Sequence, residues 1–349
     1  MTDTSLSGAA SAASDGSAAS DGSATPDTPS APETPSAPET AMPEDRDAFY
    51  AEFTERNRGF ISSATQQRLG KARLLIAGCG STGGAAVEPL ARIGVQDFVM
   101  ADTGSFELNN LNRQHAAYAD IGRHKAEVAA ERVRAINPYV KAETVPEGIT
   151  EDNADKLVAG CSVVIDGVDV TERSGWQAKY TLHRAAARAR VPVLTGYDMA
   201  GTQYIRFYDY RRAGSEPFDG RVSAHQVDHA VIWTLLFRVI PTRFIPLEML
   251  KNAREHLGED GYSVPQLVYA SLLFGALTSR MTAEILSGAP VKRNVAVNAH
   301  SATRPLPRRL AAELERPLVL IGGLRKLATR NRAASDAARN GRDTPEAAS

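Results

Sequence analysis

The sequence predicts an α/β protein with a Rossmann-like, mostly parallel sheet, helices on both faces and a disordered N-terminal tail. Between residues 73 and 208, short β-rich runs alternate with helical stretches, a pattern typical of parallel sheets. A glycine-rich segment at 78–84 follows the first run and opens a helix. Residues 1–45 hold eight acids, no base and almost nothing apolar, so they cannot recover the entropy lost on ordering.

The order of the elements follows from local composition. Apolar runs predict strands at 73–77, 98–102, 140–145, 162–166, 192–195 and 203–208. Helices are expected after residue 84 through 93, at 123–136, at 172–190 and late in the chain at 269–288. Residues 209–261 follow no regular pattern, and periodicity leaves 230–240 open as a helix or a strand.

The C-terminal segment differs in charge from the rest of the chain. Residues 301–349 hold ten bases and five acids, with possible short helices at 308–315 and 324–332 separated by Pro317 and the pair Gly322-Gly323. We therefore expect an acidic low-complexity tail at 1–45, a folded domain at 46–300 and a basic appendage at 301–349. Within the domain we expect a nucleotide-binding half at about 54–208, then a crossover and late helix at 209–300.

Composition excludes several classes of protein. The chain has 349 residues, 40 Lys+Arg, 41 Asp+Glu and a net charge of -1, which is too balanced to indicate a nucleic-acid partner. Its two cysteines exclude a disulfide scaffold and favour a reducing, cytoplasmic compartment. The N-terminus lacks the basic and apolar regions of a signal peptide. The longest uncharged run, 261–279, is too interrupted to span a bilayer and predicts a buried helix, so no membrane partner is expected.

The glycine-rich segment and Asp102 form the first part of a predicted nucleotide site. The glycines permit a tight turn and let backbone N–H groups approach a phosphate at the start of a helix. Asp102 ends the second strand, where dinucleotide-binding folds place a carboxylate that binds ribose. These two features alone favour an NAD-dependent oxidoreductase, although any nucleotide is possible.

Further charged residues change that interpretation. Arg113 follows Asp102 in the stretch Asn110-Leu-Asn-Arg-Gln, Lys125 lies at a helix start, and Asp169 follows the strand at 162–166. A pyridine nucleotide has little use for two cations and an extra carboxylate at the strand ends. A triphosphate with Mg²⁺ needs all three.

With these motifs, residues 54–208 resemble the ThiF/MoeB/HesA family, relatives of the ubiquitin-activating enzymes. The resemblance rests on the glycine loop, Asp102, Asn110–Gln114 as a match to NLxRQ, Lys125 in GxxK, and Asp169. Family members adenylate a carboxylate with MgATP and release pyrophosphate. The resemblance thus implies an adenylyltransferase whose partner is a small ubiquitin-like or sulfur-carrier protein or peptide.

The resemblance also implies roles for individual residues. Gly78, Gly80 and Gly83 would let the nucleotide lie against the backbone, although each could be a turn glycine. Asp102 would bind the ribose hydroxyls, and Asn110 would support the loop on the phosphate side or form a turn.

Arg113 and Lys125 would hold phosphates, and Asp169 would bind Mg²⁺ unless it only caps the following helix. Arg58, in a polar segment typical of solvated surface, would reach the ATP of a partner subunit, which implies a homodimer. Together these residues predict ATP and Mg²⁺ as ligands.

The chain departs from the family pattern at several positions. Gly104 and Val170 replace an acid and an asparagine that are usual there, which leaves open a catalytically degenerate partner subunit or a carrier-binding scaffold. The family's four-cysteine site is absent, so no zinc is expected. No cysteine follows Cys161, so we expect no catalytic cysteine and chemistry that stops at the acyl-adenylate. His225, Asp228 and His229 have metal-like helical spacing, but no third ligand is identifiable and the segment is irregular, so a structural or solvated role is favoured.

Overall fold

The computed structural model describes residues 44–256 and 265–340 and contains one seven-stranded sheet in the order β3-β2-β1-β4-β5-β6-β7. Strands β1 to β5 are parallel, and β6 and β7 are added antiparallel at one edge. The strands are β1 (Arg73–Ala77), β2 (Asp97–Ala101), β3 (Lys141–Val145), β4 (Val163–Asp166), β5 (Val193–Met199), β6 (Thr202–Tyr208) and β7 (Asn294–Asn298). The predicted fold class and all six predicted strands are confirmed, and β7 was missed.

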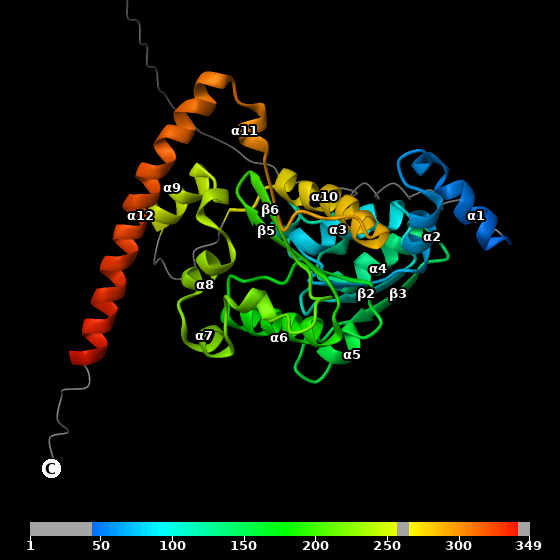
Figure 1. The fold of residues 1–349 in the computed structure, drawn as a ribbon, viewed down its shortest axis with the longest axis horizontal. Helices are drawn as coiled ribbons and strands as arrows, with labels where there is room; N and C mark the ends of the chain where they lie inside the picture. The colour runs from blue at the N-terminus through cyan, green and yellow to red at the C-terminus, as the bar shows by residue number, and fades with distance from the viewer. Residues whose placement is uncertain (1–43, 257–264, 341–349) are drawn as a thin grey trace, which may run out of the picture. The chain divides into compact units, whose positions relative to one another are not determined.

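Successive side chains of β1 point to opposite faces of the sheet, and each face carries its own hydrophobic core. Leu74 and Ile76 belong to one buried cluster, whereas Leu75 and Ala77 belong to the other. Helices α2 (Ser63–Lys71), α3 (Ser81–Arg92), α4 (Lys125–Ile136) and α10 (Val268–Ser287) pack on the first face. On the second face lie α5 (Ala154–Val158) and α6 (Arg173–Ala189), as Figure 1 shows. The central strands β1, β2 and β4 are therefore buried on both sides, as their uninterrupted apolar runs predict.

The late helix and the crossover region show one confirmed prediction and one error. Helix α10 lies within one residue of the predicted range and ends at Gly288, whose φ of +83° suits glycine. The segment predicted as irregular instead contains α7 (Ala224–His229), α8 (Ile232–Val239) and α9 (Leu247–His256). Of the run 261–279, the described part is helical only from Val268. Helices this short, two of them separated by a segment with Pro241 and Pro246, produce no long periodic pattern, which explains the error.

The C-terminal segment forms one helix, α12 (Leu306–Asn340), rather than the two predicted. It continues through Pro317, Gly322 and Gly323. Its contacts with α9 and the turn before it compensate for these weak helix formers, because Arg316 donates from Nε to the carbonyl of Ile245 at 2.9 Å. Tertiary packing thus overrides local propensity here.

The remaining helices are α1 (Arg46–Phe53), near the start of the described chain, and α11 (Ala299–Thr303), after β7. The predicted disordered tail at 1–45 lies almost entirely outside the described residues, as does the last part of the basic segment. Among the helices that the structure describes, none is both long and apolar enough to cross a bilayer.

Candidate functional site

The carboxyl ends of the parallel strands bring together segments that are far apart in the sequence. Gly78 follows β1 and Asp102 follows β2, while Asp166 ends β4. Ala77 is paired with Ala101 on one side and with Asp166 on the other, so these three ends are adjacent. Ligands of open α/β sheets bind at this edge.

The three glycines of the predicted loop serve different purposes. A Cβ on Gly78 would lie 2.5 Å from the carbonyl oxygen of Gly167, and one on Gly83 would lie 1.9 Å from that of Gly78. Packing inside the protein therefore requires both glycines. A Cβ on Gly80 would meet nothing closer than the Gln114 amide at 3.7 Å. Gly80 caps the N-terminus of α3 without any side-chain hydrogen bond, so the space above it suits a ligand that approaches the backbone.

Asp102 links the glycine loop to the segment after β2. Its Oδ2 accepts a hydrogen bond from the Cys79 amide at 2.6 Å, and its Oδ1 accepts one from Gly104 at 2.7 Å. Each carboxylate oxygen keeps a second lone pair that could accept a ribose hydroxyl. A Cβ on Gly104 would lie 3.2 Å from Asp102 Oδ1 and 3.3 Å from Lys125 Nζ. The small residue at 104 thus lets the carboxylate and the ammonium group lie close to each other.

Asn110 organises the turn that carries Arg113. Its Oδ1 accepts from the Glu107 amide at 3.2 Å, which caps a short 3₁₀ helix at Leu108–Asn110. The carbonyl of Asn110 accepts from the Arg113 amide at 3.1 Å. The buried asparagine therefore has the turn role that the sequence left open, in the loop that carries a predicted phosphate ligand.

Arg113 points toward the end of β5. Its Nε donates to Gln266 Oε1 at 2.5 Å. Gln266 forms a β-bridge with Ala200, the residue that directly follows β5. Two residues before Ala200 lies Asp198, which interacts electrostatically with Arg113. Arg113 Nη1 also donates to the carbonyl of Asn109 at 2.9 Å. The guanidinium group is thus held at the sheet edge by contacts from two loops.

Asp198 is a site residue that the sequence analysis missed. Its Oδ2 accepts from Ser81 Oγ at 2.8 Å, and Ser81 is the first residue of α3. The carboxylate also interacts with the side chain of Thr82, the second residue of α3. Burial raises the pKa of Asp198 to about 6, although the hydrogen bonds from Ser81 and Thr82 and the Arg113 charge oppose the shift. The strand predicted at 192–195 was too short, because β5 continues to Met199. A prediction three residues longer would have placed the Asp198 carboxylate at a strand end.

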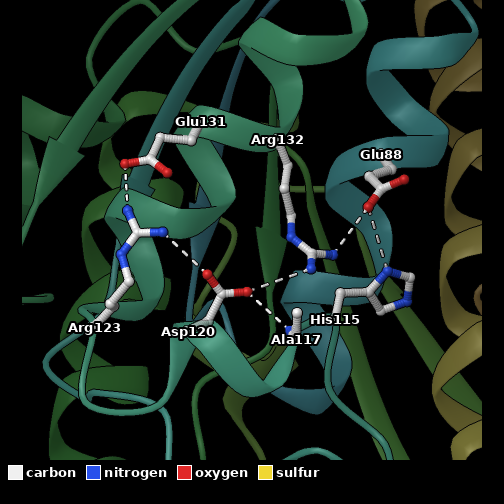
Figure 2. Close-up of polar contacts among 7 residues, drawn as sticks. All are labelled: Glu88, His115, Ala117, Asp120, Arg123, Glu131 and Arg132. Atoms are coloured by element: carbon white, nitrogen blue, oxygen red, sulfur yellow. Dashed lines mark hydrogen bonds and ion pairs between the residues drawn. The ribbon is translucent and has the colours of Figure 1, made fainter. Parts of the chain in front are cut away.

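An ion-pair network fixes the loop between Arg113 and Lys125 (Figure 2). Asp120 accepts from Arg123 at 3.0 Å and from the Ala117 amide at 2.8 Å. Arg123 also pairs with Glu131 on α4, and Arg132 pairs with Glu88 on α3 at 3.2 Å. The network therefore ties this loop to two core helices, which orients the segments that carry both cations.

Asp169 and Arg58 are the exposed acidic and basic residues among the predicted site residues, and each contacts its own segment. Asp169 is exposed, and its Oδ1 accepts from the Thr171 amide at 2.9 Å in a turn before α6, whose cap residue is Glu172. The turn nevertheless adjoins the glycine loop, because Gly167 contacts Gly78. Arg58 is exposed, with an ion pair to Glu55 at 3.6 Å.

A buried polar network lies on the opposite face of the sheet and was also missed. Lys179 Nζ is 2.7 Å from Asp166 Oδ2, with both side chains fully buried. His183 Nε2 and Thr195 Oγ1 each lie 2.9 Å from the same oxygen, and His183 Nδ1 contacts the Tyr210 hydroxyl at 2.7 Å. Burial opposes ionisation of Asp166, but Lys179 and His183 hold its pKa well below its usual range. The network anchors β4 to α6.

Neither cysteine has the surroundings of a nucleophile. Burial raises the pKa of the Cys79 thiol well above its usual value and that of Cys161 to about 11. The His225 and His229 rings stack on each other, and Asp228 accepts from Gln177 at 2.9 Å. These contacts agree with the structural or solvated role favoured for that segment.

Two known proteins are similar to part of this chain. The SAMP-activating enzyme E1 of Haloferax volcanii is 34% identical over 132 residues, which are 38% of this chain and 47% of that protein. The molybdopterin-synthase adenylyltransferase of Salmonella typhimurium is 30% identical over 155 residues, 44% of this chain and 60% of that protein. The match thus spans less than two thirds of either relative.

A solved structure shares the fold. The Escherichia coli tRNA N6-threonylcarbamoyladenosine dehydratase in complex with ATP superimposes with a TM-score of 0.50 and 22% identity, covering 69% of this chain and 96% of that one. The model of the ThiF family matches residues 54–214, which include β1 to β6 and every predicted site residue, whereas Gln266 lies outside the match. Residues 54–214 therefore belong to the ThiF family, and this part of the chain contains the residues described above.

Proposed function

We propose that the chain is an adenylyltransferase that uses MgATP to activate a carboxylate. The observation that supports this most directly is that one sheet edge combines Gly80, where a Cβ would meet nothing closer than 3.7 Å, with two cations, Lys125 next to Gly104 and Arg113 bound to Gln266. A helix N-terminus flanked by cations suits a polyphosphate. In this proposal Asp102 binds the ribose, while Gly78 and Gly83 shape the loop and Asn110 supports it.

The proposed reaction is an in-line displacement at the α-phosphorus of ATP. A carboxylate oxygen of the substrate forms a bond to that phosphorus, and the bond to the bridging oxygen of pyrophosphate breaks. The products are an acyl-adenylate and pyrophosphate. No general base is needed, because the carboxylate is ionised near neutral pH. Arg113 and Lys125 stabilise negative charge on the leaving pyrophosphate.

The proposal includes Mg²⁺, with Asp169 as the residue that the family resemblance assigns to it. A carboxylate suits Mg²⁺, and the hydrogen bond from Thr171 occupies one Asp169 oxygen, so the other remains for a ligand. When bound, Mg²⁺ neutralises phosphate charge.

The names of two relatives suggest the class of substrate. One relative activates SAMP and the other acts on molybdopterin synthase. We infer that this chain acts on the C-terminal carboxylate of a small ubiquitin-like or sulfur-carrier protein or peptide. The raised pKa values of Cys79 and Cys161 support chemistry that stops at the acyl-adenylate, without a catalytic cysteine. We also propose a homodimer in the cytoplasm, in which Arg58 reaches the partner's nucleotide.

A carrier-binding scaffold without catalysis is the second candidate. The exposed position of Asp169, together with Gly104 and Val170, favours it. Such a scaffold would bind ATP without forming an adenylate on any carrier.

The test is pyrophosphate exchange into ATP, measured with a panel of small carrier proteins and peptides. With an accepted carrier, Arg113→Ala should lower exchange by at least about 100-fold, because a cation that stabilises the transition state is lost. Arg188→Ala, which removes an exposed arginine paired with Asp155 on α5, is the control and should keep exchange. Full exchange by Arg113→Ala would overturn the proposal, and ATP binding without exchange would favour the scaffold.

A further inference from the structure

Helix α12 carries a row of exposed aliphatic side chains on one face. Its members recur every three or four residues and are between 48 and 76% exposed; they are Leu306, Leu310, Leu314, Leu318 and Ile321. At about 3.6 residues per turn and about 1.5 Å per residue, they occupy roughly 120° of arc and roughly 22 Å of helix. Soluble proteins rarely expose contiguous apolar patches of this kind, and such a patch indicates an interaction surface. We call these five residues the aliphatic stripe.

The aliphatic stripe faces away from the body of the protein. Arg316 donates to the carbonyl of Ile245, and two further residues of α12, Ala312 and Val319, pack into the core. At about 100° per residue, all three residues of α12 lie on the side of the helix opposite the stripe. Figure 1 shows α12 alongside α9, the helix that it contacts. One side of α12 is therefore held by the fold, while the described residues leave the stripe uncovered.

The charged residues beside the stripe follow a definite order. Two bases, Arg308 and Arg309, lie toward its start, and two acids, Glu313 and Glu315, follow them. At about 100° per residue, Arg308 shares one flank of the stripe with Glu315, and Arg309 shares the other flank with Glu313. All four are exposed, and of them only Glu315 has an ion pair with a described residue, Lys251 on α9. Each flank thus carries one base and one acid a few residues apart.

An antiparallel pair of α12 helices would cover the stripe with itself. A two-fold axis at position 312 places Leu306 opposite Leu318 of a second copy, and Leu310 opposite Leu314 of that copy. Helices that pack through such contacts lie about 8–10 Å apart, close enough for these side chains to interdigitate. Because the body of each chain lies behind its own α12, the two bodies do not compete for this space.

The same axis brings opposite charges together. Arg308 comes within one residue of Glu315 of the second copy, and Arg309 within two residues of Glu313, each pair on a shared flank. One or two residues correspond to about 1.5–3 Å of helix, which long side chains span easily. A parallel pair would instead place each base beside the same base of the copy, which repels it. Charge complementarity therefore favours a second copy of this chain in antiparallel orientation.

We propose that α12 pairs antiparallel with α12 of a second copy of the chain through the aliphatic stripe. The inference goes beyond the proposed function and does not depend on it. It concerns a different contact from the one proposed for Arg58, since Arg58 lies between α1 and α2. A chain that makes both contacts would assemble beyond a dimer.

The first test is sedimentation velocity of the full chain and of two charge variants. Arg308→Glu with Arg309→Glu leaves only acids at the four flanking positions, and Glu313→Arg with Glu315→Arg leaves only bases. Each double variant alone should raise the dissociation constant of the pair by at least about tenfold, because like charges then meet across it. An equal mixture of the two variants should associate again, because all-acidic flanks then meet all-basic ones.

Disulfide trapping tests the orientation of the pair. Leu306→Cys mixed with Leu318→Cys should give a crosslinked pair under mild oxidation, because the two positions face each other. Neither variant alone should crosslink, because identical positions then lie 12 residues, or about 18 Å, apart along the pair, beyond the reach of a disulfide. The native cysteines, Cys79 and Cys161, are buried and do not compete.

Two single variants separate this surface from other exposed apolar positions. Leu310→Glu should abolish the pairing, whereas Val231→Glu, at an exposed position just before α8, is the matched control and should keep it. Circular dichroism checks that both variants keep the fold.

Three outcomes would overturn the inference. The first is undiminished pairing by each charge variant alone, and the second is crosslinking of Leu306→Cys with itself, which indicates a parallel pair. The third is an unaltered chain whose mass does not change with Leu310→Glu. If vesicles of phosphatidylserine and phosphatidylcholine then bind the unaltered chain but not this variant, the stripe faces a lipid surface instead.

Discussion

Gly80→Ala and Gly83→Ala should have opposite consequences, because the two glycines lie in one loop for different reasons. A Cβ on Gly83 would lie 1.9 Å from the carbonyl oxygen of Gly78, so α3 and the loop would have to separate by about 1.5 Å in a close-packed interior. We expect Gly83→Ala to lower the free energy of unfolding by about 3 kcal/mol or more.

A Cβ on Gly80 would meet only the Gln114 amide, at 3.7 Å, which is an ordinary contact. Gly80→Ala should therefore change the free energy of unfolding by no more than about 1 kcal/mol. Its methyl group would occupy the space assigned to phosphate and should weaken ATP binding by at least about tenfold, or about 1.4 kcal/mol.

Urea unfolding followed by circular dichroism measures the first quantity, and calorimetric ATP titration measures the second. The reasoning is refuted if Gly80→Ala destabilises the protein as much as Gly83→Ala does. It is equally refuted if Gly80→Ala binds ATP as tightly as the unaltered chain.

Three other predictions concern the supports around the site. Lys179→Met should destabilise the protein by about 3–5 kcal/mol in urea unfolding, because it leaves Asp166 charged, buried and without its cation; a loss below about 1 kcal/mol would contradict the importance of this pair. Asp120→Asn should speed hydrogen exchange in residues 111–124 and weaken ATP binding, since Asp120 then lacks the charge that pairs with Arg123; unchanged exchange would mean that the network does not hold the loop. Arg316→Ala should speed amide hydrogen exchange in α12 but not in the sheet, because it removes two hydrogen bonds to the turn before α9. Equal acceleration in α12 and in the sheet would contradict the idea that α12 is held by its own contacts with this turn.

The sheet could be predicted because its strands carry a strong local signal. Leu74, Leu75 and Ile76 are apolar in succession, as a strand buried on both faces requires. Strand β7 has no such signal, since its residues are partly exposed and it begins and ends with asparagine. Its position depends on pairing with β6, a contact between residues about 90 positions apart that no local pattern contains.

The positions of the candidate site residues could be predicted where a motif contains them and not where tertiary contacts bring them together. Asp102 and Lys125 stand in recognisable motifs, and the structure brings both to Gly104. Asp198 was missed because β5 extends beyond the apolar run that predicted it, through a tyrosine whose burial the sequence does not reveal. Lys179 sits in a polar helix, and only its fully buried position identifies it as part of a network.

Titration of the purified full chain with ATP and, separately, with NAD⁺ tests the central claim most directly. The account predicts saturable ATP binding that Mg²⁺ strengthens and that Arg113→Ala and Lys125→Ala weaken, with no competition from NAD⁺. Tight NAD⁺ binding that is indifferent to Mg²⁺ and displaces ATP would contradict it.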